Sequence, residues 1–230
     1  MITTKTAAVI ASKQNPLTSL KNEMENKGIA VKMYFREDIK GYEAADAAAQ
    51  ELFDGVGKLD YLVIEALEDK NYTGKGIEEL SEEEYASWKY YAFGWFYDIN
   101  RTFIKRMAET GGGVVFGICS ESGVVPAIHQ AMNGAAGASL YMGLKCLAEE
   151  SLEDGIFTNT LAIGSTEDND SIHPMTLDAQ IVKHIPAGNI LTEDKIMKKA
   201  VDLMMLTDDT FTGNVFCADA AFSCAYMREW

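Results

Sequence analysis

Two tyrosine–lysine pairs are the residues of this sequence whose types and spacing best fit acid–base chemistry. Tyr141 and Lys145 lie within "NGAAGASLYMGLKCLAEE", and Tyr85 and Lys89 have the same spacing earlier in the chain. Residues four apart share one face of a helix. Each phenol would therefore stand beside an ammonium group, a combination suited to proton transfer. Because the pattern occurs twice, the spacing alone does not identify a catalytic pair.

The other reactive side chains form no recognisable site. No two cysteines are spaced as a CxxC pair, and none has a histidine at metal-ligand spacing. His173 and His184 lie in or near an acidic loop, 165–180, again without ligand spacing. We therefore predict no metal site, and buried thiols in a reducing compartment. The four cysteines are Cys119, Cys146, Cys217 and Cys224.

Length, composition and charge exclude several classes of protein and of partner. A chain of 230 residues suits one domain, 1–230, and 47% hydrophobic residues argue against disorder. The net charge of −15 makes nucleic acid and anionic membranes poor partners. No apolar run reaches the roughly 18 residues that span a bilayer, and the N-terminal stretch lacks a signal-peptide core. We expect a cytoplasmic protein.

Apolar and amphipathic segments alternate along the chain, which predicts a parallel sheet covered by helices on both faces. Right-handed crossovers would then give a single doubly wound domain. The predicted strands are 6–11, 29–35, 59–67, 113–119, 156–163 and 213–219. The predicted helices are 16–28, 42–57, 81–110, 130–152 and 192–206.

Four segments, in order, resemble motifs of the short-chain dehydrogenase/reductase superfamily. They are "KLDYLV", "GGGVVFGICSESG", "GIFTNTLAIG" and the closing stretch from "IPAGN" to "FCADAA". The resemblance covers nearly the whole chain. It implies an α/β fold with one Rossmann-like domain and a mostly parallel sheet. It also implies hydride transfer with NAD(P), assisted by an asparagine, a serine, a tyrosine and a lysine.

The nucleotide-binding positions of the family are altered in this chain. The three glycines of the family's phosphate-binding turn correspond here to Ala11, Asn15 and Leu17. Side chains at these positions obstruct the close approach of a diphosphate to the backbone. We therefore expect no cofactor in this chain.

The adenine-binding unit of the family is shortened as well. About 20 residues fewer than usual separate the first helix from "KLDYLV", which leaves room for one strand instead of two. We expect the sheet to lack a strand at that edge. The family's ribose-binding acid corresponds to Phe35. Arg36 could suit a 2′-phosphate, but we expect it to be an exposed, solvated side chain.

The resemblance also assigns the four catalytic positions. The serine position holds Ser120, but the tyrosine and lysine positions fall on Asn133 and Gly137, and the asparagine position on Ala92. Only one of the four matches, so we expect none of these residues to be catalytic.

The literal pair Tyr141 and Lys145 lies eight residues beyond the assigned positions. On a helix this offset is about 12 Å along the axis. We infer that neither side chain could reach Ser120 and a nicotinamide together, and the pair is not the catalytic one.

These substitutions favour a catalytically deficient homologue that acts as a structural or regulatory subunit. The resemblance implies a dimer or tetramer formed through helices 82–108 and 130–152, either with itself or with an active paralogue that binds NAD(P). "WKYYAFGWFY" in the first helix is mostly aromatic, as interfaces often are. Such a pairing resembles the hydroxybenzyl-succinyl-CoA dehydrogenase of anaerobic toluene degradation, which has one active and one degenerate subunit.

Two other interpretations remain open. The chain could be an active oxidoreductase of the family or an enzyme with rebuilt chemistry, using Ser120 with Glu121, His129 or Asn133. It could also be a sensor that binds a small ligand at the carboxyl ends of the strands.

Overall fold

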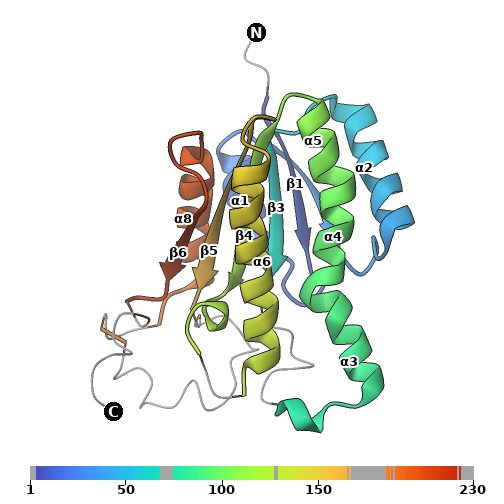
Figure 1. Cartoon of the computed structure of the whole chain (residues 1–230). Coiled ribbons are helices and arrows are strands. Elements are labelled where there is room, and N and C mark those ends of the chain that lie inside the picture. The colour runs from blue at the N-terminus through green and yellow to red at the C-terminus, as the bar shows by residue number, and fades with distance from the viewer. Residues whose placement is uncertain are drawn as a thin grey trace.

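The computed structural model is a single α/β domain built on a six-stranded parallel sheet (Figure 1). It describes residues 4–67, 75–126, 129–164, 166, 185–186, 188, 190–221 and 223. The strands are ordered β2-β1-β3-β4-β5-β6, and every pairing is parallel. Their bounds are β1 Thr6–Ala11, β2 Ala30–Phe35, β3 Tyr61–Ala66, β4 Gly113–Ser120, β5 Ile156–Ile163 and β6 Asn214–Ala218.

Helices cover both faces of this sheet, as the alternation of segments predicts. One face carries α2 (Tyr42–Val56), the long helix made of α3 to α5, and α6 (Ala131–Glu150). The other face carries α1 (Thr18–Asn26) and α8 (Glu193–Leu206). Both sides of each central strand are therefore buried, which explains why these strands read as nearly continuous apolar runs.

The sheet is short at the edge that the sequence indicates. Between α1 and β3 the chain forms only β2 and α2, and β2 is the outermost strand. Since an edge strand contacts a single neighbour, its loss leaves the remaining pairings intact. The prediction of one strand in this segment is confirmed.

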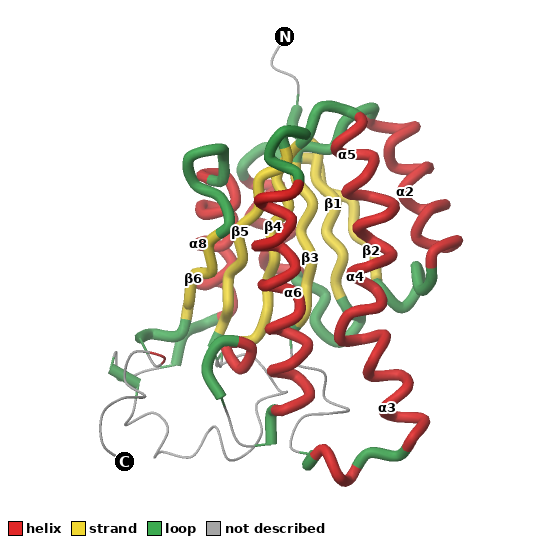
Figure 2. The backbone as a smooth tube through the Cα atoms, in the orientation of Figure 1, coloured by secondary structure: helices red, strands yellow, loops and turns green. Residues whose placement is uncertain are grey.

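The long helix predicted at 81–110 is present but contains two π-helical segments. It runs as α3 (Glu82–Lys89), a π segment Tyr90–Gly94, α4 (Trp95–Ile99), a π segment Asn100–Ile104 and α5 (Lys105–Glu109) (Figure 2). A Cβ at Gly94 would lie 2.7 Å from Cδ2 of Tyr90, so this ring needs a glycine below it. Each π turn accommodates an extra residue and rotates the following side chains around the axis.

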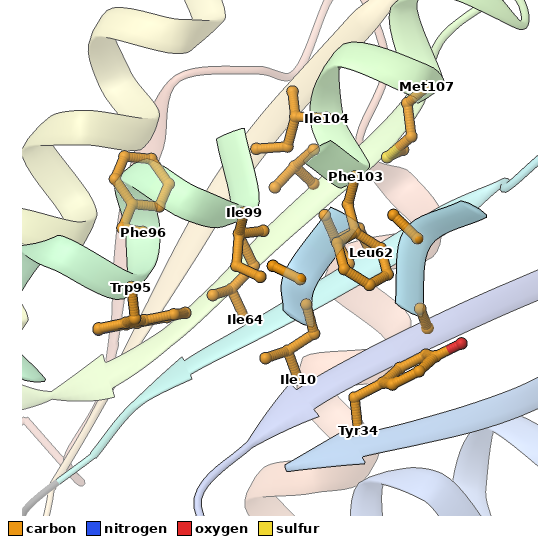
Figure 3. Packing of buried hydrophobic residues seen from close by; sticks show 14 of the residues in the cluster. Ile10, Tyr34, Leu62, Ile64, Trp95, Phe96, Ile99, Phe103, Ile104 and Met107 are labelled. Carbon is orange, nitrogen blue, oxygen red and sulfur yellow. The ribbon is translucent and has the colours of Figure 1, made fainter. Parts of the chain in front are cut away.

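That rotation places the second half of the helix on the sheet. Phe103 and Met107 are fully buried, and the Phe103 ring meets the Tyr34 ring edge to face at 5.5 Å. Figure 3 shows Ile99 and Phe103 reaching from the helix toward the strands. This core fixes the second half of the helix on the sheet, with Met107 beside Gly113 at the start of β4, while Tyr91 in the first half lies near the carboxyl end of β3.

Some predicted boundaries shift, and some predictions fall outside the described residues. Helix α1 starts at Thr18, two residues after Pro16, because Leu17 adopts a left-handed conformation. Most of the acidic loop 165–180, with His173, lies outside the described residues, as does His184.

No helix in the described ranges has the length and apolar character that a membrane span requires.

Candidate functional site

The candidate site lies at the carboxyl ends of the strands, where β1 has β2 on one side and β3 on the other. The chain order reverses at this point, and parallel α/β sheets bind their ligands in the crevice formed there. The turn after β1, the end of β3 and the first π-helical segment of the long helix come together at this point.

The turn after β1 contains the three altered glycine positions. Ala11 is buried at the end of the strand, and the amide of Asn15 donates to the hydroxyl of Ser12 at 3.0 Å. Leu17 has φ 50° and ψ 39°, and its side chain is buried in the core below α1. Glycine adopts this left-handed conformation without penalty, whereas leucine does so at a cost of about 1–2 kcal/mol.

Glu65 joins this turn to β3. It is fully buried, and its carboxylate accepts the backbone N–H of Ser12 at 2.7 Å and that of Leu67. A buried carboxylate is costly unless hydrogen bonds and an opposite charge compensate for its lost hydration. The two amides and a neighbouring arginine supply this compensation.

That arginine is Arg36, and the expectation that it is an exposed side chain is wrong. Arg36 is only 8% exposed. Its guanidinium donates to the carbonyl oxygen of Glu65 at 3.4 Å and lies 3.9 Å from the carboxylate. It also stacks over Tyr91, 4.5 Å from the ring centre, and lies 5.8 Å from the ring of Trp95.

Tyr91 closes the cluster from the helix side. Its hydroxyl donates to the carbonyl of Leu67, just after β3. Tyr91 belongs to the first π-helical segment, so the altered helix register helps to aim this ring at the end of β3. Sequence reasoning missed Glu65 and Tyr91. The detectable signal was an acidic residue within the apolar run "YLVIEAL".

Three of the four assigned catalytic positions lie at the carboxyl end of β4 and in the first half of α6. Ser120 is buried, and its hydroxyl accepts from the amide and hydroxyl of Ser122 at 3.2 and 2.9 Å. Asn133 is buried and donates its side-chain amide to Gln130 at 3.0 Å. Gly137 lies directly over Ser120, since a Cβ there would be 3.4 Å from the Ser120 carbonyl.

The turn after β4 packs tightly against α6. A Cβ at Gly123 would lie 2.7 Å from the backbone nitrogen of Ala138, so backbone meets backbone here. Tyr141 and Lys145 lie beyond this contact on α6; the first is half-buried and the second exposed. His129 is exposed at φ 56°.

Ala92 occupies the asparagine position, and its carbonyl is held by α6. The hydroxyl of Ser139 donates to this carbonyl and to that of Ala136 at 2.8 Å. A π turn interrupts the regular helical hydrogen bonding, and Ser139 provides a donor at this position. The contact ties the long helix to α6 beside the candidate site.

We expect Ser139→Ala to lower the free energy of unfolding by about 0.5–1.5 kcal/mol, because the Ala92 carbonyl loses a half-buried donor. Urea unfolding followed by circular dichroism measures the change. Ser87→Ala is the matched control, since Ser87 is exposed on α3 and its loss should change stability by less than about 0.5 kcal/mol. Equal effects of the two substitutions would contradict the assigned contact.

The prediction of buried thiols holds for Cys119 but is wrong for Cys146 and Cys217, which are exposed, so the described cysteines differ in their expected reactivity. Cys119 is buried in β4, and burial raises the pKa of its thiol to about 12, with a smaller contribution from Cys217. At pH 8 this thiol stays protonated and unreactive. We expect a thiol reagent to label the exposed Cys146 and Cys217 in the folded chain, but not Cys119. Peptide mass spectrometry reads the labelled positions, and rapid labelling of Cys119 would refute the prediction.

A groove of about 460 Å³ lies at the other end of the molecule from the candidate site, between the long helix and the end of α6. Its lining includes Arg101, Lys105, Leu147 and Asp154.

In the residues that the structure describes, no three metal-ligating side chains gather in one place.

The comparisons with known proteins identify the family. Residues 2–175 match the family described as short chain dehydrogenase, and the chain belongs to this family. A search of curated proteins finds no match. Two solved structures share the fold. One is a putative NAD(P)-dependent gluconate 5-dehydrogenase from Beutenbergia cavernae with bound NADP at low occupancy; its TM-score is 0.78 at 20% identity, covering 95% of this chain and 96% of that one. The other is ElxO with NADP bound, with a TM-score of 0.75 at 18% identity, covering 96% and 99%.

Proposed function

We propose that this chain is a catalytically deficient member of the short-chain dehydrogenase family that acts as a structural or regulatory subunit. Its partner would be an active, NAD(P)-dependent paralogue. The observation that carries the proposal is the turn after β1, where the Ser12 amide donates to an internal carboxylate and Leu17 is buried.

This turn does not fit a dinucleotide. A diphosphate needs backbone amides that face it and glycines that let it approach. Here Glu65 takes the Ser12 amide, and it brings a negative charge that would repel a phosphate. Loss of the adenine-side strand removes further contact surface.

The assigned catalytic positions support the same interpretation. Asn133 and Gly137 carry no phenol or amine, and Ala92 carries no amide side chain. Ser120 remains, but its hydroxyl accepts from the amide and hydroxyl of Ser122, and a serine hydroxyl is a weak nucleophile unless an adjacent base activates it. His129, the titrating group considered for that role, is exposed.

Exposed aromatic side chains on the long helix support a partner. Phe93 and Tyr97 are 51% and 52% exposed and stand one turn apart. Tyr91, Trp95 and Phe96 from the same aromatic stretch are buried within the domain. The unburied pair therefore marks the part of the helix best suited to contact another chain.

Two measurements test the proposal. Calorimetric titration of the purified chain with NAD(H) and NADP(H) should give no binding, and micromolar binding would overturn the cofactor-free interpretation. Co-expression with an active dehydrogenase encoded beside this chain should recover a mixed oligomer. Recovery of this chain only as a homo-oligomer would overturn the partner.

A pair of variants locates the interface. Combined Phe93→Asp and Tyr97→Asp substitutions should abolish recovery of the mixed oligomer, because charges replace exposed rings at the contact. The matched control is Leu206→Asp, which alters a 63% exposed residue at the end of α8, on the opposite face of the sheet. Loss of the complex in the control alone would contradict the proposed face.

A second candidate function is an active NADP-dependent oxidoreductase. The bound NADP in both structural relatives favours it, although at 20% and 18% identity this likeness concerns the fold. Such an enzyme would bind NADP(H) in the titration above, so the same experiment separates the two functions.

A further inference from the structure

The carboxyl ends of β1 and β3 bring together the groups of an anion-binding site. The backbone N–H groups of Ser12 and Leu67 point at one carboxylate, and the guanidinium of Arg36 lies 3.9 Å from it. Two amides and an arginine are a donor set that binds carboxylates and phosphates in many proteins. The anion here is Glu65, from the chain itself.

We infer that Glu65 is a built-in ligand, whose carboxylate occupies an anion site formed by the Ser12 and Leu67 amides and the Arg36 guanidinium. Its side chain thereby takes the donors that an anion from outside would need. The inference rests on the proposed function, in which this chain binds no dinucleotide. It adds a physical reason why a diphosphate is excluded.

The surroundings of Arg36 show that the site is built and not accidental. The guanidinium lies against the ring of Tyr91 and near that of Trp95, and the Tyr91 hydroxyl fixes the Leu67 backbone. The rings of the long helix therefore hold the Arg36 side chain in place, with its charge directed at the end of β3. Removal of the Glu65 side chain would leave two buried amides without their acceptor and would take the buried carboxylate away from the guanidinium, which keeps the Glu65 backbone carbonyl and Glu37 as neighbours.

This arrangement predicts chemical rescue by a small carboxylate. Glu65→Ala removes two carbons and two carboxylate oxygens, which together match acetate. The variant should unfold at a lower temperature than the wild-type chain. Acetate at tenfold its dissociation constant should raise the Tm of the variant by about 3–5 °C. Acetamide has the same shape without the charge and, like chloride at equal ionic strength, should have no such effect.

Two further controls make the result decisive. Wild type should show no acetate-specific shift, because its site is filled. The double variant Glu65→Ala with Arg36→Ala should lose the rescue, because the cation is gone. Equal responses to acetate and acetamide, or an acetate-specific shift in the wild type, would overturn the inference.

The isosteric variant Glu65→Gln covers the case in which Glu65→Ala does not fold. Its side-chain amide places an NH₂ group where a carboxylate oxygen accepted a backbone N–H. Hydrogen exchange at Ser12 or Leu67 should become at least about tenfold faster than in wild type; unchanged rates at both amides would overturn the inference. Nucleotide titration and partner recovery use the wild-type chain, so failure of the proposed function is read separately.

Discussion

Replacing Arg36 by alanine should lower the free energy of unfolding by about 3–5 kcal/mol, the cost of leaving one member of a buried ion pair alone. The 8% exposed side chain would no longer balance the Glu65 carboxylate, which has no solvent contact. Stacking against Tyr91 would also be lost. Urea unfolding of the two proteins, monitored by far-ultraviolet circular dichroism, measures the difference.

Two further variants separate the contributions. Arg36→Lys keeps the charge but loses the planar stacking and the geometry of the donors, so we expect a smaller loss of stability. Lys13→Ala breaks an exposed ion pair with Asp38 on the neighbouring turn and should have little effect. If Arg36→Ala were as mild as Lys13→Ala, Arg36 would not form part of a buried cluster.

The fold was largely predictable from the sequence because periodicity and burial follow the same physics. Strands buried on both faces must be apolar throughout, and helices that cover one face must be amphipathic. The short segment between α1 and β3 also fixed how many elements could fit there. Helix interruptions were not predictable in this way: the π turns at Tyr90–Gly94 and Asn100–Ile104 depend on how rings such as Tyr90 pack in three dimensions.

The candidate site was predictable only in part. Aligned positions identified Ala11, Asn15 and Leu17 as altered, because a missing glycine is visible in the sequence itself. The closure of the crevice was not visible, since Arg36 and Glu65 are 29 residues apart and meet only because β1 pairs with both of their strands. A single charged residue next to a strand end does not reveal whether its partner is water or another side chain.

Because Leu17 has a left-handed backbone conformation, we expect glycine to be more stable than alanine at this position, the reverse of the usual order in helices. Leu17→Ala should lower the free energy of unfolding by about 2–5 kcal/mol, because a 3% exposed side chain leaves the core while the left-handed backbone strain remains. Leu17→Gly loses the same contacts but relieves that strain. We therefore expect the glycine variant to be more stable than the alanine variant by about 1 kcal/mol.

Leu20 provides the matched control for this order. It is fully buried in the same core, one turn further along α1, in ordinary helical conformation. There glycine should be worse than alanine by about 1 kcal/mol, the usual cost of glycine within a helix. Urea unfolding of the four variants tests whether glycine or alanine gives the more stable protein at each of the two positions. Opposite orders at the two positions would establish that position 17 retains a backbone suited to glycine, although a buried leucine now fills it. The same order at both would show that Leu17 carries no such strain.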